Sequence, residues 1–518
     1  MKRTTLSLIA CATALAAVTG FAAVSAPDDS GTDTAAPAAR LPVERTSRLC
    51  PAPSTSDLAE TVYTSFTPVT EGAAEKGSAA LLTAESDDAT GEGKDGKGGK
   101  GGGKSDKKDG KDGKDGKSGK DEKPAVRPKA PGTPVTGKTS GADTPALIGT
   151  AEGGNAPGWT VQQTTEVAAG TGRGLQGVNC TAPDTEFWFP GASTAAGRTD
   201  YLHLTNPDDS AAVVDIELYG KDGALKSTVG EGLTVPPHAS ESLLLSTLSD
   251  VKLTDLTVHV GVRSGRVGAA VQALDDKTGG DWLAAAADPA GDLVLPGIPK
   301  DATAVRLVLF TPGGTDADLK VRLASPSGLI TPAGHETVHV KAGMTTGVDL
   351  GEVTRGEAGS LVLTPTGRPV PVVAAVRVVR GKGDERESAF IPASDPVGAR
   401  ATSADNRARS TTLSLSAPGE AAQVKVTASA GTEGGTPATK TYTVKAGTTQ
   451  NVDAPVPAGL KGSYALTVET VSGGPVHASR TLTGADEDLA SFTVQTLPDD
   501  RGTVSVPNAD EDFSVLQK

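Results

Sequence analysis

His335, Glu336 and His339 are the residues whose types and spacing come nearest to known chemistry, in the string AGHETVHVKAG. On a helix, residues four apart lie one turn above each other, so both histidines could hold one zinc ion while the glutamate activates water. On a strand, the same histidines would lie roughly 13 Å apart, at about 3.3 Å per residue, and could not share a metal. The secondary structure around them therefore decides whether a metalloprotease is expected.

The residues around the two histidines favour a strand. Pro332 and Gly334 lie at the start of the string and Gly343 follows closely, and all three disfavour a regular helix. The histidines also fall where a related segment of the chain has a strand leading into a Val-x-Ala-Gly turn. We therefore expect solvent-facing strand histidines at 335 and 339, and neither a protease nor a metal site.

Other strings that resemble functional motifs lack the context that their chemistry requires. GGKGGGKS, residues 98–105, matches the phosphate-binding loop, but charged glycine-rich repeats replace the strand and helix that must flank it. The six histidines are scattered over separate segments, and no G-x-S-x-G string occurs. We predict no catalytic residue, no bound metal and no cofactor.

The first 26 residues have the composition of an export segment. Lys2 and Arg3 are followed by an apolar run with no charge until Asp28, as in a secretory signal peptide. Cleavage after Ala26 would leave Pro27 first, which signal peptidases disfavour, so a cleaved signal peptide and a retained membrane anchor are both open. Either one places the protein outside the cytoplasm, secreted or anchored to the membrane.

Cys50 and Cys180 are the two cysteines beyond this segment. In an oxidising compartment an even pair is expected to form a disulfide bond. If the two residues lie on the first and last strands of one sandwich, their side chains can face each other.

Residues 86–146 differ in composition from the rest of the chain. From 91 to 123 the sequence contains 11 Lys and 8 Asp or Glu in KDGK-like units, and a proline-rich stretch follows. Such a segment has too few apolar groups to offset its ordering entropy, so we predict a disordered insertion. Two roles are open for it, a lysine-bearing loop that contacts anionic wall polymers or a simple spacer. The net charge of −14 argues against nucleic acid as a partner.

A short strand ending in proline recurs along the chain, at Pro51, Pro190, Pro296, Pro392 and Pro507. Between the copies, apolar residues alternate over short segments separated by turn residues, which predicts strands rather than helices. About seven strands in each unit of roughly 100 residues are typical of an immunoglobulin-like sandwich. We therefore predict an all-β protein of tandem β-sandwich modules, the first of them interrupted by the insertion, at 45–185, 186–291, 292–387 and 388–509.

The five copies of this strand-proline marker exceed the four modules by one, which leaves two arrangements for the array. The last copy either completes the fourth module of an open chain, or returns to pair near the first copy and closes a propeller-like β-ring. We expect the open chain, because units of roughly 100 residues are about twice as long as a propeller blade.

The stretch from Asn179 to Gly223 contains the most specific motifs, namely Asn-Cys, a Trp-Phe-x-Gly strand, and L-x-L-x-N-P and V-D-I-x-L-x-G strands. Together with Cys50-Pro51, these motifs resemble the repeat of uncharacterised secreted actinobacterial proteins, over roughly 45–510 outside the insertion. The third and fourth modules depart from the pattern, since they lack the Asn-Pro turn and the tryptophan. The resemblance implies a secreted or membrane-anchored envelope protein and no particular reaction.

These observations favour a non-enzymatic extracytoplasmic scaffold or interaction protein of the cell envelope, with cell-wall polymers or another envelope protein as partners. The alternative, a glycan- or cell-wall polymer-binding protein, would need exposed aromatic platforms, for which Trp159, Trp188 and Trp282 are available. Trp188 stands between two phenylalanines in a strand and is expected to pack in a core. Trp282, in the predicted loop TGGDWLAAA, is the expected ligand contact.

Overall fold

The computed structural model describes residues 39–85, 124–128, 130–227, 229–484 and 491–506. The predicted export segment and most of the predicted insertion lie outside these residues. The chain divides into two compact units, of which the larger comprises residues 42–503. The other unit is described only through most of β1 (Ala39–Pro42) and β37 (Thr503–Val506), which pair with each other.

Nearly all the regular structure of the described residues is β-strand, as predicted. The described helical segments are α2 (Leu245–Leu248) and the single 3-10 turn η2 (Gly383–Glu385). No helix in the described ranges is long and apolar enough to cross a membrane. The sheets lie in pairs that enclose apolar cores, so the repeating unit is a β-sandwich.

The first module packs the sheet β2-β6-β4 against the sheet β5-β3-β7-β8. Its core contains Trp159, Tyr63 and both cysteines. The strands are β2 (Arg45–Cys50), β3 (Ala59–Phe66), β4 (Gly77–Thr83), β5 (Val135–Ser140), β6 (Leu147–Gly153), β7 (Thr160–Val167) and β8 (Gly174–Asn179).

The predicted insertion, 86–146, extends too far toward its C-terminal end. The proline-rich part is extended, as its composition indicates, but β5 within it pairs with β3. Val126 is buried in the core of the first module and forms a bridge with Leu81. A few apolar side chains are therefore enough to give this stretch a place in the sandwich, and the predicted disorder of 86–123 lies outside the described residues.

The second module pairs the sheet β12-β11-β15-β9, in which β13 also lies beside β11, with the sheet β14-β10-β16-β17. Phe187 and Phe189 fill its core, and Trp188 between them is buried against Phe310 of the third module, with ring centroids 5.5 Å apart. The predicted packing role of Trp188 is confirmed. The strands are β9 (Glu186–Ala192), β10 (Arg198–Thr205), β11 (Ala212–Gly220), β12 (Gly223–Ala224), β13 (Leu233–Val235), β14 (Ser240–Leu244), β15 (Leu256–Ser264), β16 (Gly268–Asp275) and β17 (Gly279–Leu283).

The third module pairs the sheet β18-β24-β20-β21, in which β22 lies beside β20, with the sheet β23-β19-β25-β26. The predicted boundary at 387/388 is wrong, because β26 pairs with β25 and completes this module. The strand-proline marker opens the second and third modules but also closes the third, so it does not occupy one structural position. The strands are β18 (Leu293–Ile298), β19 (Ala304–Phe310), β20 (Ala317–Ser325), β21 (Gly328–Ile330), β22 (Thr337–Val340), β23 (Thr345–Gly351), β24 (Gly359–Pro365), β25 (Val373–Arg380) and β26 (Glu387–Pro392).

The fourth module pairs the sheet β27-β34-β29-β31 with the sheet β32-β28-β35-β36, and a short β30-β33 ribbon is attached to it. Tyr464 and the aliphatic side chains of both sheets form its core. The strands are β27 (Ala401–Asn406), β28 (Thr411–Ala417), β29 (Ala422–Gly431), β30 (Gly434–Thr436), β31 (Ala438–Val444), β32 (Thr448–Val452), β33 (Ala458–Lys461), β34 (Tyr464–Gly473), β35 (His477–Thr483) and β36 (Phe492–Thr496).

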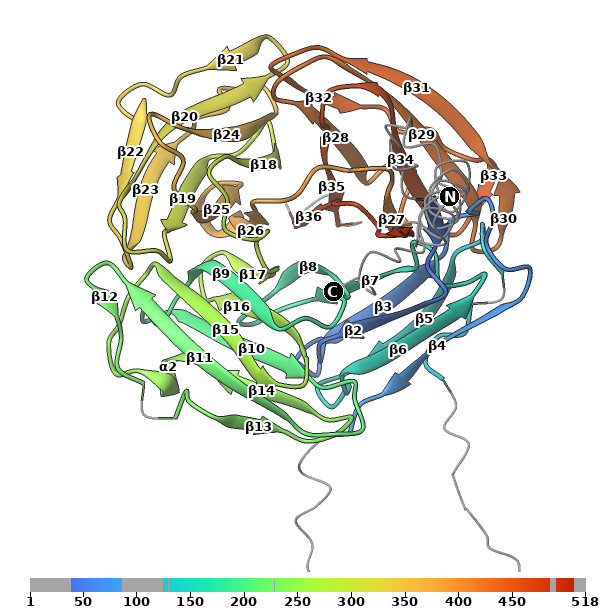
Figure 1. Ribbon diagram of the computed structural model, residues 1–518, viewed down its shortest axis with the longest axis horizontal. Coiled ribbons are helices and arrows are strands. Elements are labelled where there is room, and N and C mark those ends of the chain that lie inside the picture. Colours follow the sequence, from blue (N-terminus) through green and yellow to red (C-terminus); the bar gives the residue numbers. More distant parts are fainter. Residues whose placement is uncertain (1–38, 86–123, 129, 228, 485–490, 507–518) are drawn as a thin grey trace, which may run out of the picture. The chain divides into compact units, whose positions relative to one another are not determined.

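The four modules of the larger unit contact one another in a closed circuit. The edge strands β8, β17, β26 and β36, one from each module, contact one another in that order, and β36 contacts β8 again (Figure 1). The backbone N–H of Gly177 and the hydroxyl of Thr493 both donate to the carboxylate of Asp281, at 3.0 Å each. A Cβ at Gly177 would lie 2.6 Å from Thr493 Cγ2, so this approach requires glycine.

The junction of the fourth and first modules is built around Gln162 of β7. Its Oε1 accepts hydrogen bonds from the backbone N–H groups of Ala404, at 2.9 Å, and Asp405, at 2.8 Å, and from the buried Arg480 guanidinium at 3.1 Å. Its Nε2 donates to Asn179 Oδ1 at 2.8 Å. The modules therefore form a closed circuit, and the expected open chain is wrong. The closed alternative is correct only in part, because β36 and β8 make the closure rather than the last marker copy returning to the first. Each unit is also a two-sheet sandwich rather than a single-sheet blade.

The last copy of the strand-proline marker begins in β37, which pairs with β1 and is not a strand of the fourth module. Just inside the larger unit, the backbone N–H of Val43 donates to the carbonyl of Gly502 at 3.0 Å. The chain thus enters and leaves the larger unit at adjacent positions.

Candidate functional site: a cavity between the third and fourth modules

Cys50 and Cys180 form the predicted disulfide bond. Cys50 ends β2 and Cys180 follows β8, so the bond joins the two sheets of the first module inside its core. The Cα atoms are 4.4 Å apart, and the two residues are separated by 130 positions, so the loop that the bond closes includes the insertion.

Trp282 does not lie in a loop, and that prediction is wrong. It is part of β17, is 2% exposed, and packs against Val178 of the first module and Ala270. The glycines before it, which suggest a loop, instead allow the first module to approach closely. A ligand contact of the indole stays a prediction, and this burial disfavours it.

The two histidines of the H-E-x-x-H string have no zinc-binding arrangement. His339 lies on β22, where its Nδ1 is 2.8 Å from Asp318 Oδ1 on the neighbouring strand. His335 lies in the turn that precedes β22, so the expected strand is correct only for His339. Among the residues that the structure describes, no group of three or more His, Cys, Asp or Glu is placed to hold a metal ion.

Asp281 lies where the four modules meet and joins all of them. Besides Gly177 of the first module and Thr493 of the fourth, which donate to its carboxyl group, the backbone N–H of Phe390 in the third module acts to lower the pKa of Asp281. Burial raises the pKa of Asp281 well above its usual range, although these donors oppose the rise. Since protein donors occupy the carboxyl group, Asp281 is a structural junction rather than a group open to a substrate.

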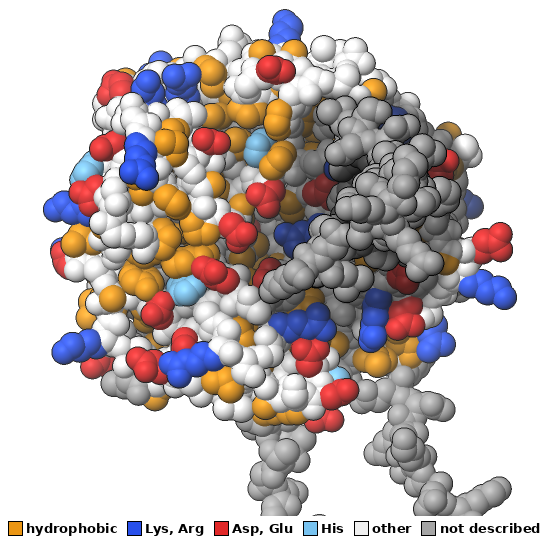
Figure 2. Space-filling view, viewed as in Figure 1, with side chains coloured by type: hydrophobic (Ala, Val, Ile, Leu, Met, Phe, Trp, Pro, Cys, Tyr) orange, Lys and Arg blue, Asp and Glu red, His pale blue; other side chains and the backbone are white. Residues whose placement is uncertain are grey.

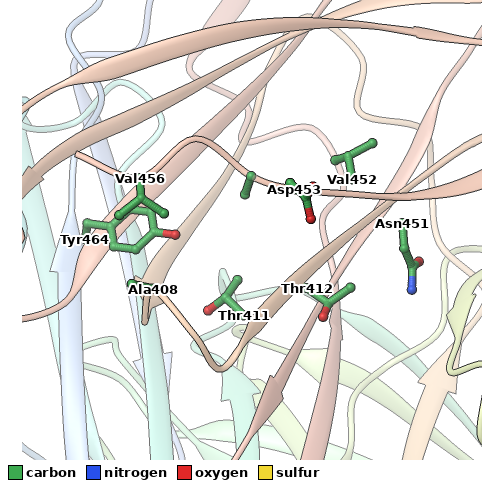
Figure 3. A pocket seen from close by; sticks show the side chains of 9 residues that line it. Ala408, Thr411, Thr412, Asn451, Val452, Asp453, Val456 and Tyr464 are labelled. Atoms are coloured by element: carbon green, nitrogen blue, oxygen red, sulfur yellow. The ribbon is translucent and has the colours of Figure 1, made fainter. Parts of the chain in front are cut away.

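A cavity of about 260 Å³ lies within the fourth module, bordered from different sides by Tyr464 and by Thr411 and Thr412 (Figure 3). Burial raises the pKa of Tyr464 to about 12, so the phenol is protonated at neutral pH. Asn451, which also lines this cavity, already accepts a hydrogen bond from Ser414 at 2.5 Å. This cavity therefore offers hydroxyl groups and one carboxylate, that of Asp453.

A second cavity, of about 300 Å³, lies between the first, second and fourth modules beside Cys180. Burial lowers the pKa of Arg48 there to about 10, an effect that Asp500 opposes. Asp500 itself pairs with Arg400 at 2.6 Å. Both signs of charge line this cavity, with Arg48 and Arg501 on the positive side and four aspartates, Asp184, Asp395, Asp499 and Asp500, on the negative side.

The largest of these three cavities, of about 450 Å³, lies between the third and fourth modules. One wall is the connection from β17 to β18, residues 284–292, where four successive alanines precede Asp288. Asp395 lines both this cavity and the one of about 300 Å³, so the two adjoin. The remaining walls come from β18, β24 and the start of β35.

His477 and Ser394 are buried at this cavity, with 8% and 9% of their surfaces exposed. His477 Nδ1 lies 3.0 Å from the carbonyl oxygen of Ser394, which can only accept, so Nδ1 has the proton and Nε2 is left as an acceptor. Burial lowers the pKa of His477 to about 4, so the ring is neutral at pH 7. The hydroxyl of Ser394 has no hydrogen-bond partner.

Three exposed carboxylates line the same cavity, those of Asp288, Asp292 and Asp395. No Lys or Arg is among the lining residues, and in the described chain none of the three forms an ion pair. Figure 2 shows acidic side chains interspersed with hydrophobic ones near the middle of one face, whereas most of the visible Lys and Arg lie toward its periphery. The 450 Å³ cavity is therefore a negatively charged site with hydrogen-bonding groups beneath it.

A family model matches residues 135–455, which is more than half of the chain. The chain belongs to the family of unknown function DUF5719. No curated protein matches the sequence. The DUF5719 match includes the three aspartates of the 450 Å³ cavity but ends before His477.

The 450 Å³ cavity of this DUF5719 chain was not predicted from the sequence, although Trp282, the predicted ligand contact, lies two residues before the connection 284–292 that forms one of its walls. The available signal was the string AAAADPAGD after β17. Small side chains leave space between two strands, and the two acids have no basic residue beside them in the string. Aromatic residues are the usual sequence sign of a binding site, and here the three tryptophans are buried instead.

Proposed function

We propose that the protein is a non-enzymatic scaffold or interaction protein of the cell envelope, secreted or held at the extracytoplasmic side of the membrane by residues 1–26. The observation that supports this most directly is the disulfide bond of Cys50 and Cys180, buried inside one module of a closed array. Such a bond forms and persists in oxidising compartments. The export-type composition of the first 26 residues favours the same location.

The closed circuit of modules supports a scaffold role. Each module contacts its neighbours through buried polar groups, as Gln162 and Asp281 do, so the surfaces of different modules keep fixed relative positions within the larger unit. A partner that touches two modules would therefore meet a preorganised surface and lose little conformational entropy on ordering it. Cell-wall polymers or another envelope protein are the proposed partners.

The lysine-rich part of the insertion is flanked on both sides by residues attached to this unit. Glu85, just before the insertion, exchanges backbone hydrogen bonds with the second module, to His238 and from Ser240. Val126, inside the predicted insertion but after its lysine-rich part, forms a bridge with Leu81. The lysine-rich residues 91–123 lie between these anchors in the sequence. The resemblance to secreted actinobacterial repeat proteins also favours an envelope role.

Export and oxidation of the full chain test this proposal. A C-terminally tagged chain is expressed beside a matched variant that lacks residues 2–26, in a bacterium with an intact secretory pathway. The full chain should be cleaved by protease added to wall-stripped cells and should have no free thiol at Cys50 or Cys180, whereas the variant should be protected and reduced. A full chain that stays inside and has free thiols would contradict the proposal.

The contact of the insertion with wall polymers is tested by its charge. Replacing the 11 lysines of 91–123 with glutamine keeps the length of the segment and removes the cations. Release from isolated envelopes at lower salt than the unmodified chain would support polymer contact. Equal retention at every salt concentration would leave the segment a spacer.

The alternative of a glycan-binding protein lacks its expected aromatic platform. Trp159, Trp188 and Trp282, the three tryptophans of the chain, are 0%, 5% and 2% exposed. None of them can stack on a sugar without a local rearrangement.

A further inference from the structure

We propose that the 450 Å³ cavity between the third and fourth modules is a binding site for a small organic cation, an ammonium group attached to a compact apolar body. The cavity volume lies within the roughly 300–1,000 Å³ typical of small-molecule sites. The proposal concerns a specific ligand site and does not depend on the envelope role.

The charge of the ligand follows from the lining carboxylates. Asp288, Asp292 and Asp395 have no cationic partner among the described residues, and no Lys or Arg lines the cavity. Three negative charges around one opening repel each other and attract a cation, and the apolar walls between them strengthen the field that the cation meets. A cation would therefore stabilise the site, and an anion would be excluded.

The hydrogen-bonding groups beneath the carboxylates are an independent indication of a ligand. Ser394 Oγ is buried without a partner, and His477 Nε2 is left as an acceptor by the hydrogen bond at Nδ1. The unpaired buried hydroxyl of Ser394 costs free energy, which a ligand that donates a hydrogen bond to it would recover. An ammonium group donates up to three hydrogen bonds and accepts none, which suits these acceptors.

The ligand is organic because the site lacks what an inorganic cation needs. No described group of His, Cys, Asp and Glu is close enough together to coordinate a metal ion. Between the polar groups the walls are largely apolar and are formed by small or aliphatic side chains such as Ala287, Ala290, Leu293, Val294 and Val362. A compact hydrocarbon body can pack against them while its ammonium group faces the carboxylates.

Three probes of one shape and different charge test the proposal by isothermal titration calorimetry on the full chain at low ionic strength. They are cyclohexylammonium, cyclohexanol and cyclohexanecarboxylate. The ammonium probe should bind with a stoichiometry of one, the alcohol at least about tenfold more weakly, and the carboxylate not measurably. The affinity for the ammonium probe should fall as salt is added.

Two charge-matched double variants locate the binding. The double variant Asp292→Asn with Asp395→Asn should lower the affinity for cyclohexylammonium at least about tenfold and leave the affinity for cyclohexanol unchanged. Asp57→Asn with Asp250→Asn, at exposed positions elsewhere, changes the net charge equally and should leave both probes unchanged. Because the aspartates are exposed, both variants should fold, which circular dichroism checks.

The role of His477 is tested with His477→Phe. This change should lower the affinity for cyclohexylammonium more than the affinity for cyclohexanol. If that buried change prevents folding, the exposed aspartate variants decide alone. No saturable binding of cyclohexylammonium, equal affinity for all three probes, or equal losses in the two double variants would each overturn the proposal.

Discussion

Replacing Gln162 with leucine should open the junction between the fourth and first modules. Leucine has a similar volume, but it would leave the backbone N–H groups of Ala404 and Asp405 and the Oδ1 of Asn179 without their partner. Each buried group left unpaired costs about 1–3 kcal/mol. With partial compensation by neighbouring groups, the expected loss of stability at this junction is about 3–6 kcal/mol.

The neighbouring residue provides a matched control. Gln163 is also a fully buried glutamine of β7, but neither of its amide atoms has a hydrogen-bond partner in the structure. Gln163→Leu removes unpaired polar atoms, so it should be neutral or stabilising.

Native-state hydrogen exchange measures the difference. In Gln162→Leu the amides of Ala404 and Asp405 should exchange at least about 100-fold faster, since about 1.4 kcal/mol corresponds to a factor of ten. Amides around residues 45–70 should also lose protection, because closure links the first module to the fourth. If Gln163→Leu accelerated exchange as much as Gln162→Leu did, or if neither changed it, the assignment of closure to these hydrogen bonds would fail.

Three other outcomes are expected. Replacing both Cys50 and Cys180 with serine should lower the free energy of unfolding by about 4–5 kcal/mol in the chain-entropy account, measured by urea denaturation, since the closed loop spans 130 residues; no change would mean that the unfolded chain is not constrained there. Trp282→Ala should cost about 3–5 kcal/mol in the same assay because the indole is buried between modules, and a loss below 1 kcal/mol would place it at the surface. For Glu387, burial raises the pKa to about 7, an effect that Arg173 opposes, so the folded state binds its proton more tightly than the unfolded state, whose value is near 4.5. The contribution of Glu387 to the free energy of unfolding is therefore greatest below pH 4.5. It falls by up to about 3 kcal/mol as the pH rises to about 7, compared with Glu387→Gln. If the free energy of unfolding had the same pH dependence in both proteins, this account would be refuted.

The strands and modules could be predicted because their pattern is local. In β11, Val214, Ile216 and Leu218 are buried while Asp215 and Glu217 between them are less so, and this alternation is visible in the sequence. The disulfide bond of Cys50 and Cys180 was likewise predictable, because it follows from the number of cysteines and from the predicted oxidising compartment. The boundary of the insertion was not, because Val126 and β5 become part of the first module only through contacts with residues far away in the chain.

Closure of the array could not be predicted from local patterns. The string GGDWL contains residues that disfavour strands, yet it forms β17, since Asp281 finds hydrogen-bond donors on the first and fourth modules and the glycines permit the close approach. The comparison of unit length with that of a propeller blade predicted an open chain. Unit length reports the size of a module, whereas closure depends on the polar groups along the edges of the modules. The cavity beside residues 284–292 was hidden for the same reason: its His477 lies nearly 200 residues away in the sequence.

The adjacency of Val43 and Gly502 bears on how the gene for this fold can be rearranged. Because the two ends of the larger unit are hydrogen-bonded neighbours, a short linker could join them without disturbing a sheet. New termini could then be cut in the exposed connection around Gly398, between β26 and β27. Such a circular permutant would begin with the fourth module and keep every contact between modules, so the order of modules along the chain is a matter of where the ring is opened rather than a requirement of the fold.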